Sequence, residues 1–182
     1  MKNVNDIIKL FEKANDRLLL KDKGLFTSNV NERTICGALM VHLHDLIKNN
    51  RSYRNYYVDV EYNRNNGKVK AIIDEKLEII PINCDLIVHS RGENRIQDNL
   101  LAVEMKKSNR PKKEKLKDKN RLIALTRKPY EGVWAYDGRA FPEYVCDYIL
   151  GVYYEIAVRA NVIMLEYYYQ GRVINQYTKT IN

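Results

Sequence analysis

Cysteine is scarce in this sequence, because only three of the 182 residues, Cys36, Cys84 and Cys146, are cysteines. They are far apart and form no Cys-x-x-Cys pair, which excludes the usual zinc-binding and redox motifs. Each lies in an apolar run and is expected to be a small buried thiol. Free thiols are typical of a reducing compartment, so the sequence predicts a cytoplasmic protein.

Long hydrophobic runs are also missing. None reaches the roughly 20 residues of a membrane-spanning helix, and Met1 to Asp6 lack the apolar core of a signal peptide. There is no internal repeat, low-complexity segment or interdomain linker. We therefore expect one domain, residues 1–182, that does not associate with a membrane.

Positive charge is abundant, with a net charge of +8. Such a balance favours a polyanionic partner, nucleic acid before anionic membrane. Between Lys106 and Arg121, seven Lys and two Arg stand against Glu114 and Asp118, which gives +7. The alternative is a solvated helix face, on which Asp118 and Arg121 form a purely structural i, i+3 pair. The candidate nucleic-acid-binding residues are Lys107, Arg110, Lys112, Lys113, Lys115, Lys117 and Lys119.

Hydrophobic periodicity gives the expected elements. It predicts helices over 4–20, 31–48 and 112–126, and strands over 56–62, 85–90, 100–106, 147–157, 161–169 and 172–178. A turn at Gln170-Gly171 joins the last two strands. Residues 21–29 and 127–142 are expected to be loops, and 68–80 fit either strand or irregular structure. This order predicts an α/β fold in which a mixed sheet is flanked by helices.

Two carboxylates and a lysine lie on neighbouring predicted strands. Asp85 begins one apolar strand, and Glu104 ends the next, with Lys106 two residues later. Alternate residues of a strand share a face, so Glu104 and Lys106 point the same way. Ionised groups at the margin of apolar strands are costly unless they are paired or bind a metal. The simpler interpretation is an edge salt bridge between Glu104 and Lys106.

These acids suit Mg²⁺, which binds proteins through one or two carboxylates and keeps several waters. Asp85 and Glu104 would bind it, and the Met105 carbonyl could add a third oxygen. Lys106 would orient or deprotonate the attacking water, or stabilise the charge on the phosphate. Glu32 lies on or beside the inward stripe of its helix and is a further candidate ligand. The alternative for Glu32 is a capping box with Asn29 as N-cap.

A histidine and many tyrosines accompany these residues. His89 is at even spacing from Asp85 and is expected on the same strand face, although a strand-end histidine without a role is the simpler interpretation. Eight of the fourteen tyrosines fall between residues 144 and 177. Packing between strands explains them better than base stacking does.

The chain resembles the PD-(D/E)xK nuclease superfamily, also called restriction-endonuclease-like. Over about residues 30–157, the matching pieces are Glu32 in an early helix, Tyr62-Asn63-Arg64, Pro81 to Asp85, and Glu104-Met105-Lys106 before a helix and a strand. Pro81 stands four residues before Asp85, where many members have adjacent Pro-Asp. The resemblance implies an αβββαβ core, here with extra C-terminal strands. It also implies Mg²⁺-dependent phosphodiester cleavage, with Mn²⁺ as a substitute metal, Glu32, Asp85 and Glu104 as metal-site acids, and Lys106 as the catalytic lysine.

We therefore expect a metal-dependent nuclease that hydrolyses DNA in preference to RNA. A homodimer is one arrangement for it, since cutting two strands often uses two copies. The alternative from another class is a catalytically inactive nucleic-acid-binding or scaffold protein with the same fold, and a third is an interaction module with a basic face. Fold alone does not decide among them.

Overall fold

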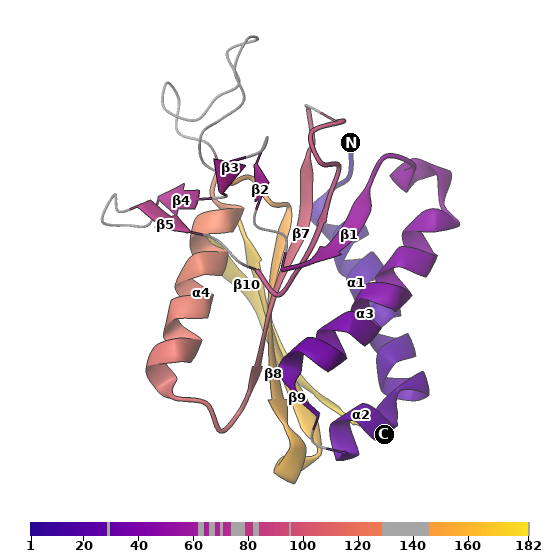
Figure 1. Cartoon of the computed structure of the whole chain (residues 1–182), viewed down its shortest axis with the longest axis vertical. Helices are drawn as coiled ribbons and strands as arrows, with labels where there is room; N and C mark the ends of the chain where they lie inside the picture. Colours follow the sequence, from indigo (N-terminus) through magenta and orange to yellow (C-terminus); the bar gives the residue numbers. More distant parts are fainter. Residues whose placement is uncertain are drawn as a thin grey trace.

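The structure is a computed structural model and describes residues 1–28, 30–61, 64–65, 68–69, 71–73, 79–81, 84–94, 96–128 and 146–181. Within these residues, a six-stranded mixed sheet forms the middle of three layers. Helices α1 (Val4–Lys21), α2 (Lys23–Thr27) and α3 (Glu32–Lys48) cover one face, and α4 (Lys112–Thr126) covers the other (Figure 1). This arrangement confirms the predicted α/β class with a mixed sheet flanked by helices.

The six strands follow the order β1-β6-β7-β8-β9-β10 across the sheet. Their bounds are β1 Tyr57–Val60, β6 Leu86–His89, β7 Asn99–Lys107, β8 Leu150–Ala157, β9 Val162–Tyr169 and β10 Arg172–Thr180. All neighbours are antiparallel except β7 and β8, which are parallel. A parallel pair needs a crossover connection, and α4 lies on that connection. Two separate two-stranded antiparallel sheets pair β2 (Arg64–Asn65) with β3 (Lys68–Val69) and β4 (Ala71–Ile73) with β5 (Ile79–Pro81). The turn η1 (Arg51–Tyr53) follows α3, and η2 (Val158–Ala160) follows β8.

Successive side chains of β7 point to opposite faces of the sheet, so the apolar core forms two layers. Val103 and Met105 belong to the cluster that packs against α1 and α3, whereas Ala102 belongs to the cluster beneath α4. Glu104 and Lys106 therefore point toward α4. The tyrosines are divided in the same way, since Tyr154 and Tyr167 are in the first cluster and Tyr153 and Tyr168 in the second. All four are fully buried, which agrees with strand packing as the role of these four, whereas Tyr169 and Tyr177 are partly exposed and Tyr144 lies outside the described residues.

Helix α3 begins one residue later than predicted and has a different cap. The side-chain oxygen of Asn31 accepts a hydrogen bond from the Thr34 backbone N–H at 2.8 Å, so Asn31 is the N-cap. Glu32 is then the first helical residue and cannot be the third position of a capping box. The capping interpretation of Glu32 was therefore wrong, while the inward stripe of Ile35 and Leu39 is buried as predicted.

Several predicted boundaries differ from the observed elements. The loop predicted over 21–29 contains α2, whose Phe26 is only 1% exposed, because a helical turn lets this ring reach the core. The ambiguous segment 68–80 contributes β3, β4 and β5. Residues 129–142 of the predicted loop, and Tyr62 and Asn63, lie outside the described residues.

Other predictions were accurate. Helix α4 has the bounds expected for it. Gln170 and Gly171 both have positive φ, 50° and 75°, as a two-residue turn between twisted strands requires. Cys36 and Cys84 are buried thiols, whereas Cys146 is partly exposed. In the part of the chain that the structure describes, no helix has both the length and the apolar character needed to cross a membrane.

Candidate functional site

Asp85 and Glu104 face each other across two antiparallel strands. The register pairs Leu86 with Val103, so the preceding Asp85 lies opposite Glu104. Asp85 Oδ2 accepts a hydrogen bond from the Met105 backbone N–H at 2.7 Å, which fixes its carboxylate beside β7. Glu104 is only 1% exposed. The structure thus brings these two predicted acids together.

Helix α4 supplies charged partners to the same place. Arg121 Nη1 lies 2.5 Å from Glu104 Oε1 and 3.3 Å from Asp118 Oδ1. Lys106 Nζ lies 3.1 Å from Asp118 Oδ2. The simpler interpretation of a Glu104–Lys106 salt bridge was therefore wrong, because each side chain has a different partner on α4. We call Asp85, Glu104, Lys106, Asp118 and Arg121 the central cluster.

Sequence reasoning found only part of the central cluster. The i, i+3 spacing predicted the Asp118–Arg121 pair, which is confirmed, but not its contact with the sheet. A usable signal was present, because Asp118, Leu122 and Leu125 fall at i, i+4 and i+7 on the buried face of α4. An acid in that stripe has to meet a cation across the interface.

Burial dominates the electrostatics of the cluster. Burial raises the pKa of Glu104 to about 8. The Arg121 guanidinium lowers this pKa, and the neighbouring carboxylates of Asp85 and Asp118 raise it further. Burial also raises the pKa of Asp85. For Lys106, burial works against the charged form, but the carboxylates of Asp118, Asp85 and Glu104 together outweigh it and the pKa is raised. Lys106 is therefore a cation at neutral pH.

The formal charges of the cluster do not balance. Three carboxylates and two cations would sum to −1 if all were ionised. A buried site of this kind lowers its energy by taking up a proton or another cation. The raised pKa of Glu104 marks that carboxyl as the place for the proton, and such shifts occur often at functional sites.

Glu32 does not join this cluster. Its Oε1 accepts a hydrogen bond from the Lys107 backbone N–H at 3.0 Å and lies 3.4 Å from Arg110 Nε. These contacts are at the end of β7, with α3 on the face opposite α4. Glu32 thus binds a β7 backbone N–H two residues beyond the one that Asp85 binds, and its role as a metal-site acid stays a prediction.

The donor atoms of the cluster fit Mg²⁺ or Mn²⁺. Asp85, Glu104 and the Met105 carbonyl offer the oxygen atoms that hard cations prefer, and Mg²⁺ needs only one or two carboxylates beside its waters. Among the described residues, no group of three or more His, Cys, Asp or Glu side chains is placed to bind a metal. A site here would use these two acids and would compete with Arg121 for a Glu104 oxygen.

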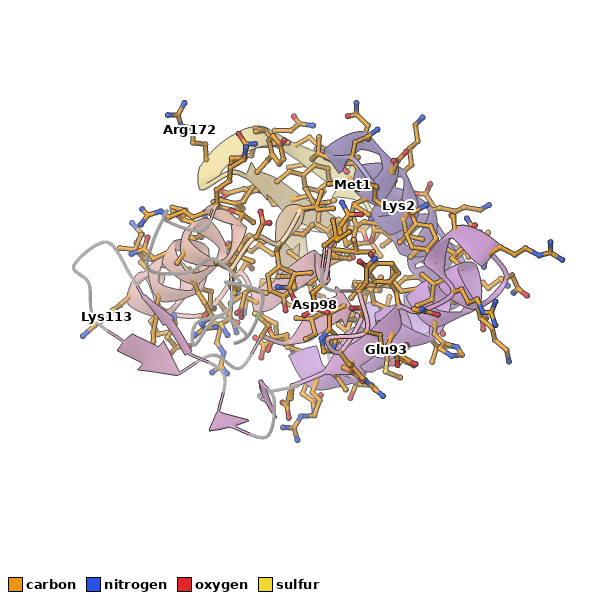
Figure 2. All side chains as sticks on the ribbon, turned by 90° about the horizontal axis from the view of Figure 1, so that it is seen from above. Met1, Lys2, Glu93, Asp98, Lys113 and Arg172 are labelled. Atoms are coloured by element: carbon orange, nitrogen blue, oxygen red, sulfur yellow. The ribbon has the colours of Figure 1, made fainter. Side chains whose placement is uncertain are left out.

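The basic run divides into outward and inward residues. Lys115 Nζ lies 2.7 Å from Glu155 Oε1 on β8, and Lys119 Nζ lies 2.6 Å from Glu166 Oε1 on β9. These lysines attach α4 to the sheet. The outward side chains, which are exposed to solvent, are those of Arg110, Lys112, Lys113 and Lys117, and Lys107 is half-buried. Figure 2 shows Lys113 at the edge of the molecule beyond α4.

His89 lies away from the central cluster. An irregularity between Val88 and His89 interrupts the pairing of β6 with β7. His89 Nε2 lies 2.9 Å from Asp59 Oδ2 on β1. His89 is the last residue of β6, whereas Asp85 stands just before its first. The simpler interpretation of His89 as a strand-end histidine agrees with this placement.

Comparisons of this chain with protein-family models, with curated proteins and with solved structures find no match. Function is therefore inferred from the residues and the geometry described above.

Proposed function

We propose that the protein is a Mg²⁺-dependent nuclease that hydrolyses DNA, with RNA as the less favoured substrate. The single observation that supports this most is the placement of Asp85 and Glu104 opposite each other on adjacent strands, with Lys106 on the same face. Phosphodiester hydrolysis needs a cation, a nucleophilic water and charge stabilisation at one point. This placement offers groups for all three.

The chain order around the site also supports the proposal. Helix α3, the antiparallel strands β1, β6 and β7 of the six-stranded sheet, helix α4 and the parallel strand β8 follow the αβββαβ order that the resemblance implies, with β2 to β5 inserted between β1 and β6. Asp85 stands before the second of these strands and Glu104 near the end of the third. We therefore propose a restriction-endonuclease-like core to which β9 and β10 are added.

Each residue has a defined part in the proposed reaction. The carboxylates of Asp85 and Glu104 and the Met105 carbonyl would bind the metal, which would supply positive charge to the phosphate and lower the pKa of a bound water. The Lys106 ammonium would donate hydrogen bonds to the phosphate oxygens. Because Asp118 keeps Lys106 charged, charge stabilisation suits it better than proton abstraction.

One observation favours the second candidate, a nucleic-acid-binding protein without catalysis. Arg121 already satisfies Glu104 within a buried ion network, and such a network can be structural. A protein that only binds nucleic acid would keep the Arg121–Glu104 pair permanently. A nuclease would have to exchange it for a metal.

We also propose a cytoplasmic location. The thiols of Cys36, Cys84 and Cys146 are all unpaired, as is usual in a reducing compartment.

Cleavage assays on purified protein test the proposed function. Labelled single-stranded DNA, duplex DNA and RNA are incubated with Mg²⁺, with Mn²⁺ and with EDTA. We expect metal-dependent cleavage that Asp85→Asn and Lys106→Met each lower by about a hundredfold or more. The matched control is Glu93→Gln, an exposed acid on the loop between β6 and β7, which should cleave like the wild type.

Two results would contradict this proposal. Cleavage that survives EDTA, or that Asp85→Asn and Lys106→Met leave intact, places the reaction elsewhere. Folded wild-type protein that binds DNA but cuts no substrate with either metal supports the second candidate.

A further inference from the structure

A second basic surface lies on the opposite side of the molecule from α4. Two clefts of about 520 and 490 Å³ adjoin each other there and share Asn49, Asn50, Arg51 and Tyr53 in their walls. Each volume is within the range of about 300–1,000 Å³ that is usual for small-molecule pockets. We call the two together the α1–α3 groove, because residues of these helices and of the turn η1 line it.

Cations dominate the lining of the α1–α3 groove. The two clefts are lined by seven basic side chains: Lys9, Lys13, Arg17, Lys48, Arg51, Arg54 and Arg91. The only carboxylates that line the described clefts are Asp6 and Asp45, both in the smaller one. Seven cations against two carboxylates leave a formal charge of +5. A groove with one sign of charge attracts a polyanion.

The local structure aligns these cations along the groove. Lys9, Lys13 and Arg17 are four residues apart and therefore share one face of α1. Arg51 begins the tight turn η1 and Arg54 caps its end, three residues later, a spacing at which side chains of such a turn lie above each other. The Asn50 side chain accepts a hydrogen bond from the Ser52 backbone N–H at 3.0 Å and fixes the start of this turn.

Most of these cations have no internal partner. In the part of the chain that the structure describes, Lys9, Lys13, Arg17, Lys48, Arg51 and Arg54 form no ion pair with another residue. The inward cations of α4 differ in this respect, because Lys115 and Lys119 are paired with the sheet acids Glu155 and Glu166. Among the described residues, the groove thus presents cations without ion-pair partners, whereas two of the cations on α4 are paired with acids of the sheet.

A planar pair forms part of the wall of the larger cleft. The Arg91 guanidinium lies over the Tyr57 ring, 4.4 Å from its centroid, and two hydrogen bonds from Arg91 to Asp59 fix its plane. Asp98 accepts hydrogen bonds from the Ser90 and Gly92 backbone N–H groups and so shapes the turn around Arg91. Guanidinium and aromatic planes are surfaces on which unpaired bases stack.

We propose that the α1–α3 groove binds single-stranded nucleic acid. Phosphates contact Arg51, Arg54 and the row of cations on α1, and a base stacks near the Arg91–Tyr57 pair. This site goes beyond the proposed cleavage, because α1 and α3 cover the face of the sheet opposite the central cluster and the Arg91–Tyr57 pair lies at the β1 edge rather than beneath α4. Binding here requires no metal, so it stands or falls separately from catalysis.

Binding of a fluorescein-labelled 20-nucleotide single-stranded DNA in EDTA tests this proposal. The variant Arg51→Glu/Arg54→Glu should bind on the order of tenfold more weakly at 0.1 M salt. Its slope of log affinity against log salt should fall by about 0.7 for each phosphate that the variant no longer binds. The matched control is Lys21→Glu/Lys23→Glu, which changes the net charge equally at two exposed residues that line neither cleft and should bind like the wild type.

Circular dichroism confirms that both variants are folded before their binding is compared. The proposal is wrong if the arginine variant binds as tightly as the lysine control, or if the wild type does not bind the strand. Vesicles of phosphatidylcholine with phosphatidylserine form the second arm. Binding of vesicles but not of DNA, abolished in the arginine variant, would assign the groove to a membrane surface instead.

Discussion

Glu104 is a carboxyl group that the fold buries almost completely and yet surrounds with charge. Its pKa of about 8 lies well above the ordinary value of 4.5, because desolvation outweighs the attraction of Arg121. Between these two pH values the native state binds a proton that the unfolded state has released. Stability therefore falls as the pH rises through this window.

We predict that the free energy of unfolding decreases between pH 5 and pH 8 by an amount on the order of a few kcal/mol. Glu104→Gln should flatten this decrease, because a neutral amide cannot titrate. Asp85, whose pKa is also raised, contributes with the same sign and should leave a smaller slope. Urea denaturation followed by circular dichroism at several pH values measures the effect. An unchanged slope in Glu104→Gln would show that Glu104 is not the group that titrates.

The same proton has a consequence for metal binding. A carboxyl that is protonated near neutral pH has to lose its proton before it can bind a cation, so metal affinity should rise with pH. In the proposed nuclease, Glu104 would exchange both a proton and the Arg121 contact for the metal. This exchange links the ionisation of one residue to the activity of the site.

At the scale of elements, the contact between α4 and the sheet depends on a close approach at β8. A Cβ atom on Gly151 would lie 3.0 Å from Thr126 Cγ2 and 3.2 Å from Tyr168 Cβ. Both neighbours are buried in packed positions and cannot move freely. A glycine at this point of β8 lets α4 lie close enough for its charged side chains to reach the sheet.

We predict that Gly151→Ala destabilises the protein by about 1–3 kcal/mol, because the added methyl group pushes α4 away from the sheet. The matched control is Gly37→Ala in the interior of α3, where a Cβ meets no atom within 4 Å. That change should be neutral or stabilise by up to about 1 kcal/mol, since alanine favours helix. Thermal unfolding of both variants measures the difference. Equal stabilities would mean that the α4 contact tolerates a larger spacing.

At the scale of the whole molecule, the net charge of +8 is distributed over two faces that differ in kind. On the α4 side, inward cations stabilise the interface with the sheet, and the remaining lysines project into solvent. On the α1–α3 side, most of the cations that line the described groove have no internal partner. The charge count along the sequence alone assigned nearly all of the net charge to the first face.

We predict that two sets of lysines on α4 respond differently to substitution. Lys112→Glu/Lys113→Glu/Lys117→Glu should weaken DNA binding and change the stability by less than about 0.5 kcal/mol, because these side chains are exposed. Lys115→Ala/Lys119→Ala should instead lower the stability by about 1–3 kcal/mol, because the two buried sheet acids Glu155 and Glu166 lose the cations that pair with them. Fluorescence anisotropy and thermal unfolding separate the two effects. The division is wrong if both sets change the same quantity.

How far the sequence predicts this fold can be judged from particular residues. The periodicity located α4 correctly, and Gln170-Gly171 identified a hairpin turn, because both depend on neighbours along the chain. Alternation also placed Glu104 and Lys106 on one face. His89 also stays on the face of Ile87, because β6 pairs with β1 in continuous register up to His89. The capping prediction failed at Glu32, where the N-cap stands two residues after the expected one.

By itself the sequence determined the α/β class, most of the helices and strands, and the pairing of Asp85 with Glu104 across neighbouring strands. These features follow from spacing along the chain, and hydrophobic burial enforces that spacing. The tertiary structure alone decided that Asp118 and Arg121 join those acids and that Glu32 contacts the end of β7. It also decided which lysines are paired and that α1, α3 and η1 form a basic groove. Such contacts join residues far apart in sequence, and only the packing of helices on the sheet brings them together.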